Sequence, residues 1–331
     1  MRRRAFLGGM LGIASLRIDR AFANPALASI TVNGTVVPTM QAAADIGGSI
    51  FLSRGVLAAQ VAGVAIGAAH FRKPAMVAGQ GTQIADQSIE DKGTFVVDAD
   101  ASFTGLDIAG ATGDGIGAAF RHQSGNLLVR RTKIHRCQNG LLGPARFVDC
   151  ALVVDDCDVF DNGTGTGQTH GLYVGAISEF TCNNSRFRAT DIGHHIKSRA
   201  RRTTISDCQV GTDFMGTESY NVDVPQGGDV TIVGSHMRQG PHTDNNAMLN
   251  FGGERDPYSG GSLVVTGTAF ESTAGGTGIR IHPNADVIAR LENCMFIGLD
   301  VPVDGRCEVK NCRHDGRLLP DRLHLRGAPW R

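Results

Sequence analysis

Five short stretches of alternating residues carry the side chains that could do chemistry in this chain. They span 171–175, 195–199, 221–225, 247–251 and 278–282, and each has an aliphatic residue or a methionine at its second position. Alternate residues of a strand point to opposite faces, so an inward second position turns the third position outward. The predicted outward row consists of Tyr173, Lys197, Asp223, Leu249 and Arg280.

The first and fifth positions of each stretch should point to the same side as the third. They add His195, Arg199, Asn221 and His282 to the outward face. Parallel strands in register lie about 4.8 Å apart, so the first three stretches would share a patch of roughly 10 to 12 Å. Lysine is otherwise rare, with five after residue 23, and its occurrence here beside Tyr, His, Arg, Asn and Asp marks this face as the candidate site.

Removal of a proton beside a carboxylate is the chemistry that these residue types suit. When such removal leads to elimination, it needs a cation for the carboxylate, a base for the proton on the adjacent carbon and a donor for the departing oxygen. Arg199 suits the first task, because guanidinium binds carboxylate in a bidentate manner. Lys197 is the preferred base, since cations at Arg199 and His195 would favour its neutral form. His170 is the competing base, and Tyr173 is the expected proton donor.

The remaining polar residues of the face are expected to bind substrate. Asn221 and Asp223 would orient Lys197 or bind a sugar hydroxyl. A plainer interpretation stays open, because an outward lysine beside an aspartate is often only an exposed ion pair worth about 0 to 1 kcal/mol. The predicted substrate-binding set is His195, Asn221, Asp223, Arg280 and His282.

A metal site has weaker support. Asp155, Asp156, Asp158 and Asp161 lie close together, and carboxylate oxygens are the ligands that calcium prefers. The first two flank an inward strand, however, and Asp156 stands where a carboxylate bonds the backbone of a turn. The sequence contains no Cys-x-x-Cys or His-x-x-x-His pattern typical of zinc sites. We therefore predict no cofactor and no metal, with calcium as the remaining alternative.

The elements that position these residues follow from a repeated column of small residues. Its members are 18 to 33 residues apart, and Asn or Asp directly precedes five of them. Such a period, with Gly, Asn and Asp between short apolar strands, is typical of a solenoid of stacked β coils. Together with the alternating stretches, it predicts a parallel β-helix. The column comprises Thr132, Cys157, Ser185, Cys208, Ser235, Thr268, Cys294 and Cys312.

Composition agrees with a single all-β domain. Of 331 residues, 44 are glycine and 19% are charged, which suits a core with many sharp turns and disfavours disorder. No linker interrupts residues 24–315, which we predict to form one β-helix domain. A short helix at 38–46 is expected to cap the first coil. We expect the C-terminal tail at 316–331 either to cover the last coil or to be loose.

The N-terminal segment resembles a targeting signal. An Arg3-Arg4 pair, a weakly apolar run to Leu16 and an Ala-Phe-Ala cleavage site predict a twin-arginine signal peptide at 1–23, and hence a periplasmic or secreted protein. The run is too short to span a bilayer. Its removal takes away five Arg and one Asp and leaves a net charge of −4, which argues against a nucleic-acid partner.

Cysteine usage carries a separate prediction. Eight cysteines in an exported chain would ordinarily suggest disulfides. Four of them lie in the inward column of small residues, however, where a small polarizable side chain stacks well. We therefore expect mostly buried free thiols.

These features together resemble a known family. The helix, the Gly-Gly-Ser-Ile-Phe-Leu stretch at 47–52 and the Asn/Asp-Cys/Ser-x-Phe/Val coils are similar to the right-handed parallel β-helix repeat proteins of the pectate-lyase-like superfamily. The resemblance covers nearly all of the chain after residue 23. It implies a right-handed β-helix, and members are commonly carbohydrate-active lyases, hydrolases or epimerases of acidic polysaccharides.

Three functions follow as hypotheses. The first is a polysaccharide lyase, or a related C5 epimerase, with an anionic uronic-acid polysaccharide as its partner. The second is a glycoside hydrolase, which usually needs two carboxylates about 5 to 10 Å apart, whereas the outward patch offers only Asp223 clearly. The third is a non-catalytic glycan-binding or envelope-assembly protein, because a solenoid presents a long surface whether or not it cuts a polymer.

Overall fold

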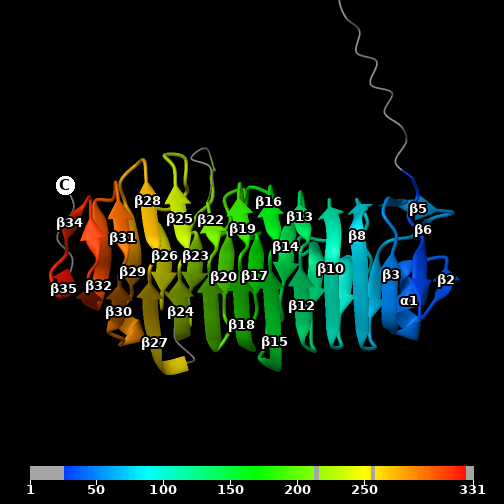
Figure 1. Ribbon diagram of the computed structural model, residues 1–331, viewed down its shortest axis with the longest axis horizontal. Coiled ribbons are helices and arrows are strands. Elements are labelled where there is room, and N and C mark those ends of the chain that lie inside the picture. The colour runs from blue at the N-terminus through cyan, green and yellow to red at the C-terminus, as the bar shows by residue number, and fades with distance from the viewer. Residues whose placement is uncertain (1–25, 212–215, 255–257, 326–331) are drawn as a thin grey trace, which may run out of the picture.

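The computed structural model describes residues 26–211, 216–254 and 258–325, which form a parallel β-solenoid of about ten turns (Figure 1). Strands account for 54% of the chain and helices for 3%, so the predicted all-β parallel coil is confirmed. The predicted signal peptide at 1–23 lies outside the described residues. Within the described ranges, no helix is long and apolar enough to cross a membrane.

Each turn of the solenoid contributes strands to three parallel ladders. The first ladder contains β3 (Gly48–Leu52), β8 (Ala75–Ala85), β10 (Ala101–Ala109), β12 (Leu127–Arg130), β15 (Val148–Asp155), β18 (Ile177–Asn183), β21 (Arg202–Ser206), β24 (Gly227–Val233), β27 (Tyr258–Thr266), β30 (Ala289–Glu292) and the second half of β32 (Val301–Lys310). The second ladder contains β4 (Val56–Leu57), the ends of β8 and β10, β13 (Lys133–His135), β16 (Asp158–Phe160), β19 (Arg186–Arg188), β22 (Gln209–Val210), β25 (His236–Gln239), β28 (Ala269–Ser272), β31 (Met295–Ile297) and β33 (Arg313–His314). The third ladder contains β7 (Ala69–Phe71), β9 (Gly93–Val97), β11 (Ala118–His122), β14 (Asn139–Leu142), β17 (Leu172–Val174), β20 (Ile196–Ser198), β23 (Val222–Val224), β26 (Ala247–Phe251), β29 (Thr277–Ile281) and the first half of β32.

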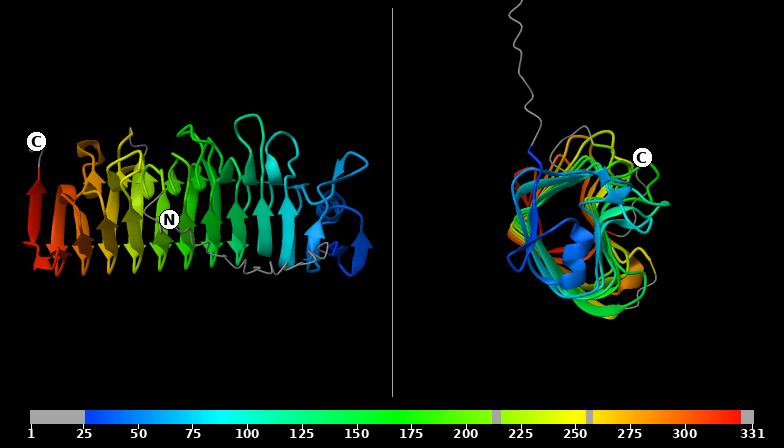
Figure 2. Two further views of the ribbon diagram at one scale, coloured as in Figure 1. Left: turned by 90° about the horizontal axis from the view of Figure 1, so that it is seen from above. Right: turned by 90° about the vertical axis from the view of Figure 1, so that its right-hand side faces the viewer.

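The N-terminal end of the solenoid is covered by a helix. α1 (Met40–Ile46) lies across the opening when the solenoid is viewed along its axis (Figure 2). The Thr39 hydroxyl accepts the Ala42 N–H at 3.1 Å, so Thr39 caps the helix where the sequence predicts its start. The buried residues of the helix are Met40, Ala43 and Ala44. Beside the helix, β1 (Ile30–Val32) pairs antiparallel with β2 (Thr35–Val37) and β3.

The C-terminal end is covered by strands. β35 (Arg322–Leu325) runs antiparallel to β32, and β34 (Arg317–Leu318) pairs with β33. The described part of the predicted tail therefore covers the last coil and extends the sheet beyond residue 315. Two small elements lie outside the ladders, namely the hairpin of β5 (Gln60–Val61) and β6 (Val64–Ala65) and the 3-10 helix η1 (Pro283–Ala285).

The column of small residues marks one corner of the coil. Asp156, Asn184, Asp207, Asn293 and Asn311 directly precede members of the column, and their φ angles lie between 47° and 55°. Asn and Asp tolerate this left-handed conformation better than other residues with a side chain. The small residue that follows turns inward, and the column stacks through bonds such as Cys157 N–H to Ser185 Oγ at 3.1 Å.

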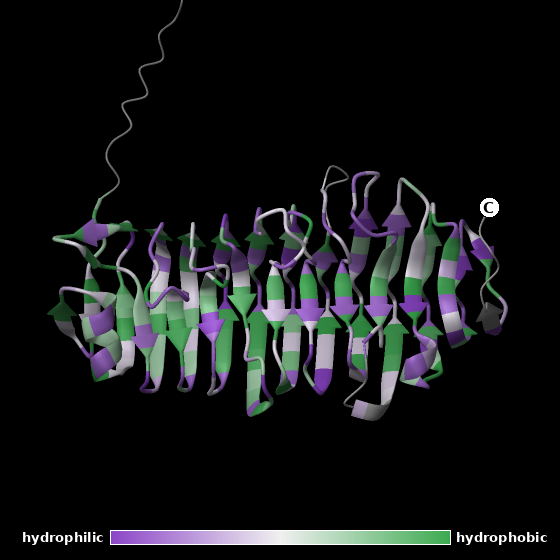
Figure 3. Ribbon diagram, turned by 180° about the vertical axis from the view of Figure 1, so that it is seen from behind, coloured by the Kyte–Doolittle hydropathy of each residue, from purple (hydrophilic) through white to green (hydrophobic). Residues whose placement is uncertain are grey.

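The core consists of inward residues from all three ladders. Hydrophobic residues alternate with polar ones along the strands, and hydrophilic residues gather at the turns (Figure 3). Phe71, Phe95, Phe103 and Phe120 pack together at the N-terminal end with neighbouring centroids 4.8 to 5.7 Å apart. All eight cysteines are buried free thiols, as predicted.

Candidate active site

The third ladder carries the predicted outward row. Tyr173 of β17 lies in register with Lys197 of β20, and Lys197 with Asp223 of β23. Lys197 Nζ lies 6.0 Å from the centre of the Tyr173 ring. The residues on which the predicted site depends therefore share one wall of the solenoid.

The next position of the row differs from the prediction. Leu249, predicted to point outward, pairs with Val222 and Ile279 and is fully buried. Asn250 takes its place on the outward wall. The stretch 247–251 has apolar residues at every position except 250. Alternation alone therefore does not determine which of its residues point inward. The core contacts of Leu249 and Phe251 decide it, because both side chains are fully buried.

Two further predictions of orientation are wrong. His195 and Asn221 are both fully buried, although alternation placed them outward. His195 Nδ1 lies 2.8 Å from Thr190 Oγ1, and its Nε2 lies 3.5 Å from Glu218 Oε1. Asn221 Nδ2 donates to two backbone carbonyls at 2.9 and 3.3 Å. Each residue stands one position before its strand, where the chain turns a corner, so the strand rule no longer applies and neither side chain reaches the outward wall.

Arg199 bonds to two other members of the cluster. Its Nε donates to Tyr173 Oη at 2.8 Å, and its two terminal nitrogens donate to the Glu254 carboxylate at 2.6 and 2.8 Å. This is a bidentate pair, the strongest form of an arginine–carboxylate contact. Lys197 Nζ lies 3.7 Å from the same carboxylate. The predicted Tyr173, Lys197 and Arg199 are thus brought together, with Glu254 as a fourth member.

Glu254 is absent from the predicted set. It lies in the turn after β26, 55 residues from Arg199 in the chain. The hydrogen bond from Arg199 holds the pKa of Glu254 below its ordinary value. Burial opposes charge on Arg199, but the bonds to Glu254 and Tyr173 raise its pKa overall. The only signal for Glu254 in the sequence is that an acidic residue stands in a Gly-rich turn directly after the alternating stretch 247–251.

Two histidines stack behind the tyrosine. The ring of His170 lies 5.6 Å from that of Tyr173 and 4.8 Å from that of His194, nearly parallel to both. The His194 amide donates to His170 Nδ1 at 3.0 Å, and the Tyr220 amide donates to His194 Nδ1 at 3.3 Å. Because Nδ1 accepts a hydrogen bond in each ring, the neutral imidazole carries its proton on Nε2.

The protonation of these rings changes the role of His170. Burial, together with the Lys197 and Arg199 charges, lowers the pKa of His170 to about 3. Burial and the neighbouring cations likewise lower the pKa of His194 to about 2. His170 is therefore a neutral hydrogen-bond donor at Nε2. It does not have the geometry of the base that the sequence offered as an alternative to Lys197.

Asp223 lies at the floor of the cluster with only 4% of its side chain exposed. Asn250 Nδ2 donates to its Oδ1 at 2.8 Å, and Lys197 Nζ and His194 Nε2 lie 3.4 and 3.5 Å from its Oδ2. Burial raises the pKa of Asp223, although the Lys197 charge acts in the opposite direction. His282 Nε2 donates to Asn250 Oδ1 at 2.8 Å, so the predicted His282 reaches Asp223 through Asn250.

Lys197 has different neighbours from those that its assignment as a base requires. His195 lies in the interior, and two carboxylates flank Nζ at 3.4 and 3.7 Å. The second cation that was to favour a neutral lysine is therefore absent. An ion-paired ammonium group at this position suits the neutralisation of a substrate carboxylate.

Arg280 extends the row toward the C-terminal end. One of its terminal nitrogens donates to Asn246 Oδ1 at 3.0 Å, and its Nε lies 4.0 Å from Asp304 Oδ2. A quarter of its side chain is exposed. Of the predicted substrate-binding residues, Arg280 therefore has a guanidinium that a polymer on the outward wall could touch.

A recess of about 490 Å³ adjoins the cluster where the third ladder turns into the first. Tyr173 and Arg199 line it together with Arg201 and two further aromatic rings. A site of this size with few convergent polar groups is typical of ligand pockets. The cluster thus opens onto a hollow and not onto a flat sheet.

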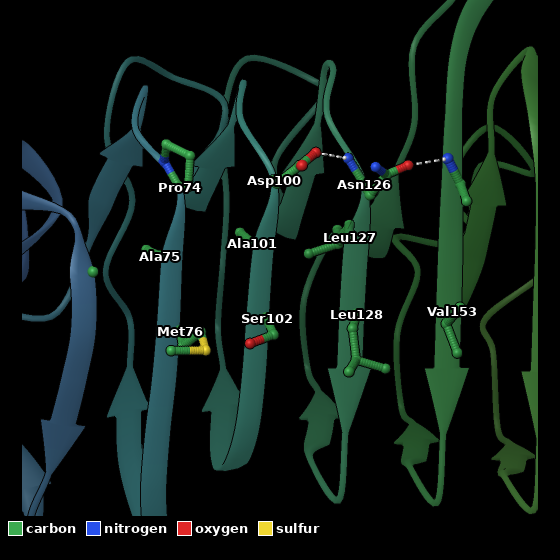
Figure 4. Close-up of a pocket in the computed structure, with 12 residues that line it drawn as sticks. Pro74, Ala75, Met76, Asp100, Ala101, Ser102, Asn126, Leu127, Leu128 and Val153 are labelled. Carbon is green, nitrogen blue, oxygen red and sulfur yellow. Dashed lines mark hydrogen bonds between the residues drawn. The ribbon is translucent and has the colours of Figure 1, made fainter.

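A second recess, of about 480 Å³, lies on the first ladder near the N-terminal end (Figure 4). Met76, Leu128 and Val153 line it across neighbouring strands. Its carboxylate, Asp100, accepts the Asn126 N–H at 2.7 Å and so holds the backbone. This recess has no group poised for proton transfer and is not the candidate active site.

Two of the four acidic residues that suggested a calcium site are paired with arginines. Asp155 accepts from Arg130 Nε at 2.7 Å, and Asp158 accepts from Arg188 at 3.3 Å. Among the described residues, no group of three or more His, Cys, Asp or Glu side chains is arranged to hold a metal ion.

Comparisons with known proteins give a likeness of fold. No family model matches the chain, and no curated protein matches it. The solved structure of Geobacillus virus E2 ORF18 is similar with a TM-score of 0.57 and 14% identity, over 83% of this chain and 56% of that one. The chain thus spans little more than half the length of that structure. The A-module of mannuronan C-5 epimerase AlgE6 from Azotobacter vinelandii matches over 83% of this chain and 94% of that one, at 14% identity and a TM-score of 0.32.

Proposed function

We propose that the protein is a polysaccharide lyase that removes the C5 proton of a uronic acid unit in an anionic polymer. The observation that carries the proposal is the placement of Tyr173 Oη, 2.8 Å from Arg199 Nε and on the same wall as the Lys197 ammonium group. A proton-transfer group and two cations meet there beside a recess. Proton removal next to a carboxylate needs this combination.

Tyr173 is the proposed proton-transfer residue. Arg199 Nε is hydrogen-bonded to its oxygen, and in the proposed step Tyr173 acts as the phenolate and accepts the C5 proton. The electron pair of the C5–H bond passes toward the substrate carboxylate, whose charge is neutralised by Lys197. The pair then forms the C4–C5 double bond as the C4–O4 bond breaks. The departing O4 takes the proton from Tyr173, which restores the phenolate.

The other members of the cluster hold this arrangement. His170 and His194 stack behind Tyr173 as neutral rings and fix its orientation. Glu254 binds both terminal nitrogens of Arg199 and so aims Nε at Tyr173 Oη. Asp223 and Asn250 form the floor and position Lys197.

Hydrolysis has less support from the same geometry. It usually uses two carboxyl groups that are available on either side of the glycosidic bond. Glu254 is bound bidentately by Arg199, and Asp223 is buried and bonded by Asn250. Both carboxylates of the cluster are therefore engaged with other side chains.

The test is incubation of the chain lacking residues 1–23 with polymannuronate, polyguluronate and polygalacturonate. Ultraviolet absorbance of the unsaturated product follows elimination. Nuclear magnetic resonance in D2O follows exchange at C5, which also reports epimerisation. We expect the chromophore to form on at least one polymer.

The matched variants are Tyr173→Phe and Tyr220→Phe. Tyr173→Phe should lower the rate about 100-fold or more, because a positioned acid–base group contributes about that much. Tyr220→Phe removes a hydroxyl two coils away from Tyr173, where the ring packs 5.1 Å from that of His194, and should retain activity. Neither chromophore nor exchange on any polymer, with the fold intact, would contradict the proposal. New reducing ends without a chromophore would indicate a hydrolase, and binding without product would indicate a glycan-binding protein.

Two coarser proposals accompany this one. The first is that the protein is a member of the pectate-lyase-like superfamily, which the coil pattern supports. The second is that it is exported by the twin-arginine route to the periplasm or the medium, which the Arg3-Arg4 segment supports. Fractionation of cells that express the full chain, compared with an Arg3→Lys, Arg4→Lys variant, tests the second. Retention of the variant in the cytoplasm is the expected result.

A further inference from the structure

Arg201 differs from the arginines around it in lacking an acidic partner. Its guanidinium carbon lies 5.2 Å from the ring centre of Phe147 and 6.0 Å from that of Tyr258. It forms no ion pair with any residue in the described ranges. By contrast, Arg199 binds Glu254, and Arg202 lies 3.6 Å from a Glu179 carboxylate oxygen.

The two rings hold this guanidinium in place. Tyr258 Oη donates to the backbone carbonyl of Arg199 at 2.9 Å, which fixes the tyrosine over the recess. Arginine that lies over aromatic faces keeps the N–H groups at its edge available for a ligand. Arg201 is therefore a cation held beside two rings, and its guanidinium N–H groups have no acceptor among the described residues.

The recess joins Arg201 to the candidate active site. Tyr173 and Arg199 of the cluster line it together with Arg201, Phe147 and Tyr258. A ligand that extends from Tyr173 into this hollow would meet Arg201 next. Since Glu254 already occupies the terminal nitrogens of Arg199, Arg201 supplies the positive charge that remains for an anionic ligand among the residues lining this recess.

We propose that this recess binds the carboxylate of the uronic acid unit adjacent to the one at Tyr173, with Arg201 as its bidentate partner. The inference rests on the proposed function for the identity of the polymer. It adds a second anionic subsite, so the enzyme would require two consecutive acidic units and not one. A polymer in which acidic and neutral sugars alternate would then bind poorly.

The test measures binding and turnover separately. Isothermal titration calorimetry gives the dissociation constants of mannuronate and galacturonate tetrasaccharides and of their carboxyl-reduced counterparts. Wild type should bind an acidic tetrasaccharide more tightly than its neutral counterpart. Arg201→Gln should weaken that binding about 10- to 100-fold, the usual effect of losing a charge-assisted hydrogen-bonded pair. It should leave binding of the neutral tetrasaccharide unchanged.

Arg202→Gln is the matched control, because it removes the same charge from the next residue, whose side chain is 61% exposed and paired with Glu179. Phe147→Ala, which removes one ring from Arg201, should weaken binding by a smaller factor. Equal affinities for Arg201→Gln and wild type would overturn the inference, as would an equal loss in Arg202→Gln or no preference for acidic ligands. Selective loss in Arg201→Gln without any C5 exchange by wild type would support the subsite and contradict the lyase.

Discussion

Arg199 donates from Nε to Tyr173 Oη at 2.8 Å while its terminal nitrogens bind both oxygens of Glu254. One planar guanidinium thus joins a strand of the preceding coil to a turn that follows two coils later. Because both of its edges are occupied, the position of the positive charge next to the tyrosine oxygen is set by three hydrogen bonds.

Replacement of Arg199 by lysine tests whether Tyr173 needs only a positive charge nearby or also the planar donors of the guanidinium. Lysine keeps the positive charge but cannot supply the planar donors that meet Tyr173 and Glu254 together. We expect kcat to fall about 10- to 100-fold with a smaller change in KM, measured from initial rates of unsaturated product. Arg202→Lys should have little effect. If the Arg199→Lys variant has the same kcat as wild type, the guanidinium does not position Tyr173.

Acid should destabilise the protein through its stacked histidines. The pKa of His170 is about 3 in the folded protein and about 6.5 when unfolded, so the unfolded state takes up a proton first as the pH falls. His194 behaves in the same way. The stability that their neutral forms contribute is complete above pH 6.5 and is lost toward pH 3. Between pH 7 and 5.5 we expect the free energy of unfolding to fall by about 1 to 3 kcal/mol.

His170→Asn provides the control for this pH dependence. The asparagine amide oxygen can replace Nδ1 as acceptor of the His194 N–H but does not titrate. Urea unfolding at several pH values should therefore show a shallower decline than in wild type. Comparison of the two proteins cancels the contribution of Asp223, whose raised pKa acts with the opposite sign. Identical slopes would contradict the assignment of a neutral, buried His170.

Asn184, in a turn, tests how much the left-handed backbone conformation affects the free energy of unfolding. Asn184 has φ of 47° and is exposed. Asn184→Val should lower the free energy of unfolding by about 1 to 2 kcal/mol, because a β-branched side chain is strained there. Asn184→Gly, which tolerates the same angle, should cost much less. A loss as large for glycine as for valine would mean that the asparagine side chain matters, and not its backbone conformation.

The thiols should be unreactive in the folded protein. All eight cysteines are buried, and burial raises the pKa of Cys137 to about 12. Because burial keeps a thiol reagent away from every sulfur, the reagent should label none of the eight before unfolding and all eight in denaturant. A reductant should leave the melting temperature unchanged. Labelling of fewer than eight in denaturant would indicate a disulfide.

Alternation predicted the wall correctly wherever the strand pattern was unambiguous. Tyr173, Lys197 and Asp223 each stand between two fully buried residues, and all three lie in register on the third ladder. The rule was wrong for His195 and Asn221, which precede their strands, because a corner residue is not bound by the pleat. It was wrong for Leu249 as well, because several apolar neighbours compete for the inward side.

The amino-acid sequence by itself determined the coil, since the Asn or Asp before five of the eight small residues and the small residues themselves are local requirements of backbone conformation and core space. It also determined that tyrosine, lysine and arginine stand on one wall, because the pleat has a period of two. Only the tertiary structure decided the partners of those residues. Glu254 reaches Arg199 across 55 residues, and two backbone amides donate to Nδ1 of His170 and of His194. These contacts depend on how turns of different length fold back over the wall, which no local pattern encodes.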